Sequence, residues 1–230
     1  MNQLDINTFL DKLQQWATEF AKSRGLTPPT SVLRGDLHTD EAYHFLRALD
    51  NEIVEVNNIG ECSLPKLHRT IRKPTEPCLF PRKRNQIYLF WREYITQVGA
   101  VARLVLDYGW KENLVALDPN DWEFNLACYS GPDSSAKMII AGETKKTETE
   151  LRTMLNSLLN ASNSTLTLVQ LNSTDGHKKY KGLLKEQPLY FWAVAPGVSR
   201  SFSVKYNKGC ALREISDLPS YQDLLNVKGF

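Results

Sequence analysis

Apolar residues recur three and four positions apart in the first half of the chain, which is the spacing of a helix. One such stripe lies within residues 4–24 and predicts a helix that ends before Gly25. A second stripe predicts a helix that begins at Thr39, whose hydroxyl is suited to capping it, and runs toward Val54. A third, wider apolar face over residues 86–108 predicts a long helix that packs on a sheet.

The pattern changes from helical to alternating after residue 109. Residues 114–117, 122–129 and 137–146 are expected to form three consecutive strands. Turn signals rich in Asp, Asn, Gly, Pro and Ser separate these strands at residues 118–121 and 130–135. The sequence therefore predicts strands that follow one another directly, joined by short turns.

Strand alternation places the polar residues of these segments on defined faces, because successive side chains point to opposite sides. In the second strand, Glu123 and Asn125 are expected to share one face. In the third strand, Glu143 and Lys145 share one face near its end, with Thr144 on the other. An apolar run that ends in Glu-x-Lys thus presents a carboxylate beside an ammonium.

The segment after residue 146 combines one more helix with several short elements. Thr147 and Glu150 fit a capping box at the start of a helix whose apolar positions run from Leu151 to Leu159. The other predictions are a strand at 166–171, a polar loop at 172–182, strands at 189–194 and 201–206 around a Pro-Gly turn, and a short closing helix from Asp217.

Composition allows a packed core, because 42% of the 230 residues are hydrophobic and 23% are charged. The net charge is only +2, so any affinity for nucleic acid must come from local patches. The first 22 residues lack the basic start and apolar block of a signal peptide, and no apolar run of about 18 residues occurs. We therefore expect a cytoplasmic protein with no membrane span.

Four cysteines, at positions 62, 78, 128 and 210, are widely spaced and form no C-x-x-C pair. We expect them to be reduced, as in a cytoplasmic protein. A zinc site made by Cys62, His68 and Cys78 is conceivable. However, its spacing matches no standard site and a fourth ligand is missing.

Basic residues concentrate in the proline-punctuated segment 57–84. Two interpretations stay open: a solvated surface loop, or a contact with phosphates, whose charge clustered Lys and Arg neutralise. The basic stretch at 176–182 has the same two interpretations, with the solvated loop favoured. The candidates for nucleic-acid binding are Arg69, Arg72, Lys73, Arg82, Lys83 and Arg84.

The expected order from residue 86 is helix, strand, strand, strand, helix, strand, strand. Glu123 and Asn125 lie on one predicted strand, and Glu143-Thr-Lys145 lies at the end of the next. In this order and spacing the chain resembles the PD-(D/E)XK nuclease superfamily. The resemblance covers residues 86–206. It implies an α/β (α+β) fold with a restriction-endonuclease-like αβββαβ core, a mixed central sheet flanked by helices. Residues 86–230 would form this domain, and residues 1–85 an N-terminal helical and basic extension.

The resemblance also implies a chemistry. Phosphodiester hydrolysis needs a hard cation, Mg²⁺ or Mn²⁺, which takes oxygen ligands. Glu143 would bind the metal, with the Thr144 carbonyl as a further ligand. Lys145 would orient or help to deprotonate the attacking water, and a neighbouring cation would lower its pKa. The expected partner is DNA or RNA, and a homodimer would allow two sites to cut two strands.

One position departs from the family pattern. The superfamily usually carries Asp where this chain has Asn125, and an amide supplies no full negative charge. Three explanations stay open: Glu123 supplies the carboxylate, the site is naturally impaired, or Asn125 is an engineered substitution of Asp. Asp118 and Asp121, near the preceding turn, are additional sources of a carboxylate.

Three hypotheses for function follow. The first is a metal-dependent endonuclease that hydrolyses phosphodiester bonds in DNA, in restriction, repair or defence. The second is a catalytically impaired module of the same fold that binds nucleic acid or protein. The third is a structural partner that assembles through the apolar helix at 86–108. Against all of them stands the plain alternative that Glu143 and Lys145 are an exposed ion pair worth less than about 1 kcal/mol.

Overall fold

The computed structural model describes residues 3–32, 37–68, 79–80, 91–119, 123–163, 174–207 and 209–226. These residues fall into two compact units, one drawn from 1–66 and 73–102 and the other from 67–72 and 103–230. The boundary that we predicted between residues 85 and 86 lies outside the described residues and stays a prediction.

The first unit contains α1 (Gln3–Ser23), α2 (Thr39–Asp50) and the short antiparallel pair β1 (Glu55–Val56) and β2 (Cys62–Ser63). The helices α1 and α2 pack through apolar residues, with the Phe9 and Phe45 rings 5.1 Å apart. The cap of α2 differs from our prediction. His38 rather than Thr39 is the N-cap, because its Nδ1 accepts from the Asp40 N–H while Glu41 accepts from the His38 N–H.

The chain continues through α3 (Arg92–Leu106), which belongs to the first unit up to residue 102. The remaining elements all lie in the second unit. They are the 3-10 turn η1 (Glu112–Leu114), β3 (Val115–Leu117), β4 (Leu126–Tyr129), β5 (Met138–Thr144), α4 (Glu148–Ser162), α5 (Asp175–Glu186), β6 (Tyr190–Ala195), β7 (Val198–Asn207), β8 (Gly209–Ile215) and α6 (Tyr221–Leu225).

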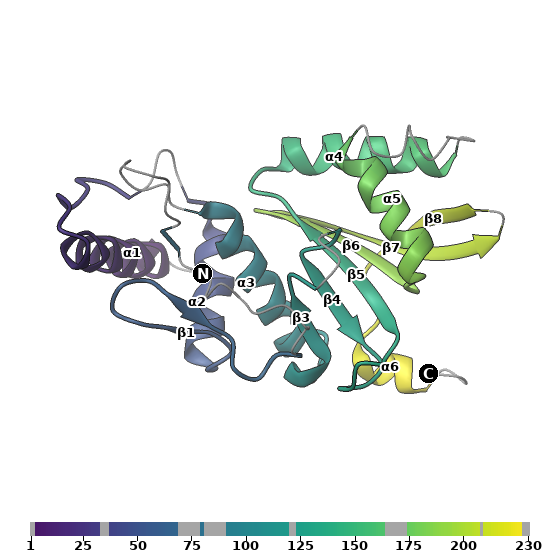
Figure 1. Ribbon diagram of the computed structural model, residues 1–230, viewed down its shortest axis with the longest axis horizontal. Coiled ribbons are helices and arrows are strands. Elements are labelled where there is room, and N and C mark those ends of the chain that lie inside the picture. The colour runs from purple at the N-terminus through teal and green to yellow at the C-terminus, as the bar shows by residue number, and fades with distance from the viewer. Residues whose placement is uncertain are drawn as a thin grey trace. The chain divides into compact units, whose positions relative to one another are not determined.

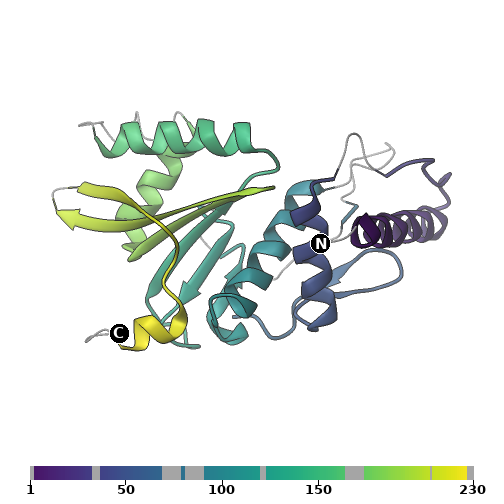
Figure 2. The ribbon, with the colours of Figure 1, turned by 180° about the vertical axis from the view of Figure 1, so that it is seen from behind.

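A six-stranded mixed sheet organises the second unit, with the strands side by side in chain order from β3 to β8 (Figure 1). Every neighbouring pair is antiparallel except β5 and β6, which are parallel. A parallel pair needs a long crossover, and α4 and α5 lie between these two strands in the chain. Both helices lie against the same face of the sheet (Figures 1 and 2).

The apolar core of this unit lies between the sheet and the helices α4 and α5. Every residue of β5 is buried, as expected for a central strand covered on both faces. The core cluster is built mainly from alanines and aromatic residues of the strands and leucines of α4. Gly142 allows the close approach of β4, because a Cβ there would lie 2.8 Å from Cβ of Leu126. The strand that carries Glu143 is therefore fixed tightly in place.

Helix α5 contradicts our prediction of a polar loop at 172–182. Thr174 caps the helix by accepting from the His177 N–H. Gly176 and Gly182, which look like helix breakers in the sequence, let α5 approach its neighbours. A Cβ at Gly176 would lie 2.5 Å from backbone atoms of α4, and one at Gly182 would lie 2.5 Å from Oε2 of Glu123. Close packing therefore outweighs the low helix propensity of glycine.

The mixed α/β architecture agrees with the predicted fold class, and the order α3, β3, β4, β5, α4 follows the predicted order. The strand predicted at 166–171 lies outside the described residues. Strand β7 pairs with β8, and the sequence pattern did not predict β8. The closing helix is present as α6.

No helix in the described part of the chain is long and apolar enough to span a membrane. Cys62, Cys128 and Cys210 are buried, and their reduced state stays a prediction. Cys78, a member of the conceivable zinc site, lies outside the described residues, so that site stays untested.

Candidate functional site

The end of β5 places Glu143 and Lys145 on the face of the sheet that α5 covers. Glu143 is only 1% exposed, whereas the Lys145 side chain is 16% exposed. Nζ of Lys145 lies 2.6 Å from Oε1 of Glu143, as the period of two along a strand predicts. The pair is therefore a partly buried ion pair rather than the exposed one of the plain alternative.

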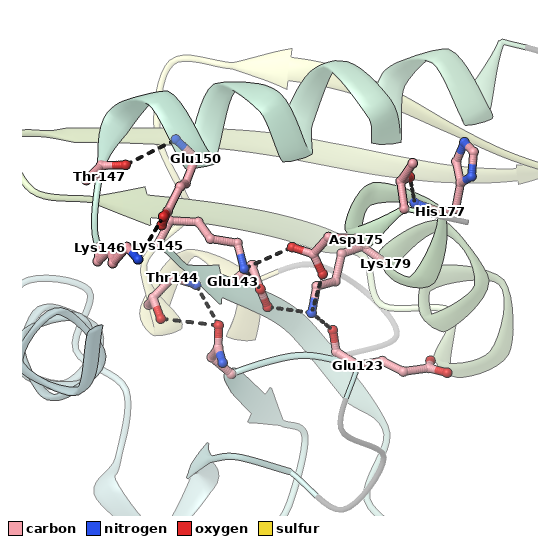
Figure 3. A network of polar contacts seen from close by, with 12 residues as sticks. Glu123, Glu143, Thr144, Lys145, Lys146, Thr147, Glu150, Asp175, His177 and Lys179 are labelled. Atoms are coloured by element: carbon pink, nitrogen blue, oxygen red, sulfur yellow. Dashed lines mark hydrogen bonds and ion pairs between the residues drawn. The ribbon is translucent and has the colours of Figure 1, made fainter. Parts of the chain in front are cut away.

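Two further charged residues from the start of α5 complete a network of alternating charge (Figure 3). Asp175 is the second ion-pair partner of Lys145, and its Oδ2 lies 2.9 Å from Nζ of Lys145. Lys179 reaches the other oxygen of Glu143, at 2.8 Å, and lies 3.7 Å from Oδ1 of Asp175. Each carboxylate therefore faces both ammonium groups. The Asp175 side chain is 43% exposed and connects the network to solvent.

The network shifts the pKa values of Lys145 and Asp175. Burial favours the neutral amine of Lys145, but the charge and hydrogen bond of Glu143, followed by those of Asp175, outweigh it and raise the pKa of Lys145. Burial also opposes ionisation of Asp175, yet Lys145 and Lys179 hold its pKa below the ordinary value. This differs from our expectation of a lowered Lys145 pKa, because the carboxylates of Glu143 and Asp175 both contact its ammonium group.

A row of three polar residues crosses the sheet next to this network. The register pairs Leu117 with Leu126, and Leu126 with Gly142. One position further along, Asp118 donates its N–H to the carbonyl of Asn125 at 2.7 Å. The row therefore runs from Asp118 through Asn125 to Glu143 on three neighbouring strands.

Asn125 is integrated into this row through both ends of its amide. Its Oδ1 accepts from the backbone N–H of Thr144 at 2.9 Å and from the Thr144 hydroxyl at 3.2 Å. Its side chain also forms a hydrogen bond with Asp118 that lowers the pKa of that carboxyl. A carboxylate at position 125 could not donate to Asp118, so the neutral amide suits its surroundings.

Asp118 is the carboxylate that the row adds to Glu143. Burial raises its pKa, the hydrogen bond with Asn125 lowers it, and the negative charge of Glu143 raises it again, leaving it above its ordinary value. Asp118 keeps an exposed surface despite its neighbours. It also adopts a left-handed backbone with φ of 47°, a conformation that costs energy for most residues and that Asp tolerates better than most residues other than glycine.

Glu123 takes part in the site only through its backbone. Lys179 donates a hydrogen bond to the Glu123 carbonyl oxygen. The Glu123 carboxylate points away from Glu143 (Figure 3). Its Oε2 has no hydrogen-bond partner in the described part of the chain. Among the three explanations for Asn125, the one in which Glu123 supplies the missing carboxylate gains no support from this placement.

The predicted nucleic-acid contacts cannot be placed. Arg69, Arg72, Lys73, Arg82, Lys83 and Arg84 all lie outside the described residues, as does Asp121. The lysines of the basic stretch 176–182 differ in their exposure to solvent. Lys178 and Lys181 are exposed on α5, whereas Lys179 is buried against the network.

Among the described residues, no group of three or more His, Cys, Asp or Glu side chains is arranged to hold a metal ion. The acidic set near the end of β5 comprises Glu143, Asp118 two strands away and Asp175 on α5, and these three do not form such a group. Sequence reasoning identified Glu143 and named Asp118 as an additional source. It missed Asp175 and Lys179, although their i, i+4 spacing after the capping Thr174 was a signal for a helix.

No protein-family model matches this chain, and neither a curated protein nor a solved structure does.

Proposed function

We propose that the protein is a metal-dependent phosphodiesterase of the PD-(D/E)XK type that acts on nucleic acid, with DNA as the expected substrate. The observation that carries the proposal is the placement of Glu143 and Lys145. They lie together at the end of a buried strand, beside a parallel neighbour reached through α4 and α5. The element order α3, β3, β4, β5, α4 followed by a parallel strand supports the αβββαβ interpretation.

The donor set is compatible with Mg²⁺. This ion prefers oxygen ligands and is commonly held by one or two carboxylates together with substrate phosphates and waters. Glu143 and Asp118 would hold it, with the Thr144 carbonyl as a further candidate. The negative charge of Glu143 contributes to the raised pKa of Asp118, which supports a location of the two carboxylates near each other. A shared cation would relieve this repulsion.

The bound metal would polarise a phosphoryl oxygen and lower the pKa of the attacking water. Lys145 keeps its proton, because Glu143 and Asp175 raise its pKa. It would therefore act as a fixed positive charge beside the phosphate rather than as a base, and would stabilise the charge that develops during hydrolysis. Asn125 would hold Asp118 and Thr144 in place through its amide.

Cleavage of plasmid DNA, single-stranded DNA and RNA during titration with Mg²⁺ or Mn²⁺ tests the proposal. Glu143→Gln and Lys145→Met are each expected to reduce cleavage by about 100-fold or more. Lys146→Met is the matched control, because Lys146 is the next residue and pairs with Glu150 at the surface, 3.1 Å away. Absence of metal-dependent cleavage by the wild type on all three substrates would contradict the proposal.

A second candidate is a catalytically impaired module of the same fold. It is favoured by one observation: both oxygens of Glu143 already face ammonium groups, one from Lys145 and one from Lys179. Such a module would bind nucleic acid without cutting it, which fluorescence anisotropy with a labelled oligonucleotide would detect. The homodimer stays a prediction, and light scattering tests it.

A further inference from the structure

Lys179 is surrounded by the kind of oxygen atoms that a hard divalent cation takes. Its Nζ contacts Oε2 of Glu143, Oδ1 of Asp175 and the carbonyl oxygen of Glu123 (Figure 3). These oxygens come from three separate segments, so the position is fixed by the fold rather than by one flexible loop. The Lys179 side chain is only 6% exposed and also lies 6.0 Å from the centre of the Phe124 ring.

The charges around Lys179 are nearly balanced while the ammonium is in place. Glu143, Asp175 and Asp118 bring negative charge, and Lys145 and Lys179 bring positive charge. A divalent cation added to this arrangement would meet an ammonium already 2.8 Å from the oxygen it needs. Like charges at such a distance repel strongly in a poorly solvated site.

We propose that the Lys179 ammonium and a divalent cation compete for Oε2 of Glu143, so that Lys179 must leave before the metal is held tightly. This inference rests on the proposed function. A phosphate group of the substrate offers the departing ammonium a new partner of opposite charge. Metal and nucleic acid therefore bind cooperatively, each raising the affinity of the protein for the other.

Mn²⁺ binding by the full-length protein without nucleic acid tests the competition, with free Mn²⁺ followed by electron paramagnetic resonance. Lys179→Met removes the charge and keeps an unbranched side chain. It is expected to tighten Mn²⁺ binding by at least about tenfold. Lys178→Met is the matched control, since Lys178 is the preceding residue on the exposed face of α5, and it should change Mn²⁺ affinity less than about twofold. Unchanged or weaker Mn²⁺ binding by a folded Lys179→Met protein would overturn the proposal.

Two further measurements keep the test decisive if Lys179→Met does not fold. Lys179→Gln also removes the charge but can still donate a hydrogen bond to Glu143, and it should tighten Mn²⁺ binding in the same direction. For the wild type, a short oligonucleotide should lower the dissociation constant for Mn²⁺. Equal Mn²⁺ affinity with and without the oligonucleotide would contradict the proposed cooperativity.

The outcomes separate this inference from the proposed function. Tighter Mn²⁺ binding by Lys179→Met, with no cleavage of nucleic acid by either protein, supports the competition and contradicts the hydrolase. Metal-dependent cleavage by the wild type, with no tightening in Lys179→Met, contradicts only the competition.

Discussion

At the scale of single residues, Asn125 is the position at which this chain departs from the acidic pattern of the superfamily that it resembles. Its amide accepts from Thr144 and bonds to Asp118, so a neutral side chain connects three strands. An Asp at this position would keep the acceptor and lose the donor. It would also add a carboxylate next to one whose pKa is already raised. In this arrangement Asn125 suits its surroundings, and in the proposed site Asp118 would supply the second carboxylate.

Asn125→Asp is therefore expected to destabilise the protein by about 1–3 kcal/mol in the absence of metal, since Asp118 loses its donor and gains a like charge. Urea unfolding measures this loss. Asn57→Asp is the matched control, because the Asn57 amide also donates to a carboxylate, that of Glu61 at 2.8 Å, but in an exposed turn where the loss should be smaller. A large gain in metal-dependent cleavage by Asn125→Asp would instead identify the present chain as an inactivated version.

Part of the candidate site was predictable from single residues. Strand alternation alone places Glu143 beside Lys145, and the contact of 2.6 Å confirms it. The same rule failed for Glu123, because β4 begins only at Leu126 and the alternation does not extend as far back as Glu123. Lys179 was not predictable as a member of the site, since no local pattern indicates that a lysine so far along the chain from Glu143 would contact it.

At the scale of helices and strands, α5 is the element for which the sequence pattern gave a wrong prediction, a polar loop. Two glycines and a run of lysines are typical of a loop, and helix propensity supports that interpretation. The packing of α4 against α5 requires the small residue, which only the tertiary structure reveals. The helices α1, α2 and α4 were predictable because their apolar stripes are long and regular.

Gly176→Ala tests this account of α5. Alanine is normally the better helix former by about 1 kcal/mol. Here its Cβ would lie 2.5 Å from N of Leu158 and from O of Met154, so the helices must separate. We expect a net loss of about 1–3 kcal/mol in the free energy of unfolding. Gly131→Ala is the control, because its nearest neighbour is 3.6 Å away and the change should stay within about 0.5 kcal/mol. Equal stability of both variants would refute the close-packing argument.

At the scale of the whole molecule, the second unit is closed by contacts between distant parts of the chain. Tyr108, which follows α3, donates its hydroxyl to Asp217 at 2.5 Å, and its carbonyl accepts from the Tyr221 N–H of α6. Burial, reinforced by the hydrogen bond to Asp217, raises the pKa of Tyr108 from 10.0 to about 12. The folded state therefore favours the neutral phenol.

The direction of the resulting pH dependence follows from linkage. The stabilising contribution of Tyr108 is fully present below the unfolded pKa of 10.0 and is lost as pH rises toward about 12. Urea unfolding of the wild type and Tyr108→Phe should show the wild type as more stable below pH 10, with the advantage shrinking above it. An advantage that stays constant or grows above pH 10 would contradict the raised pKa.

The central claim is that Glu143 and Asp118, beside the ammonium of Lys145, hold one divalent cation. Anomalous diffraction from crystals of the protein grown with Mn²⁺ and a short oligonucleotide tests it most directly. The account predicts a manganese peak within about 2.5 Å of a carboxylate oxygen of Glu143, on the side of Asp118. A peak bound elsewhere, with Glu143 still paired to both lysines, would contradict it.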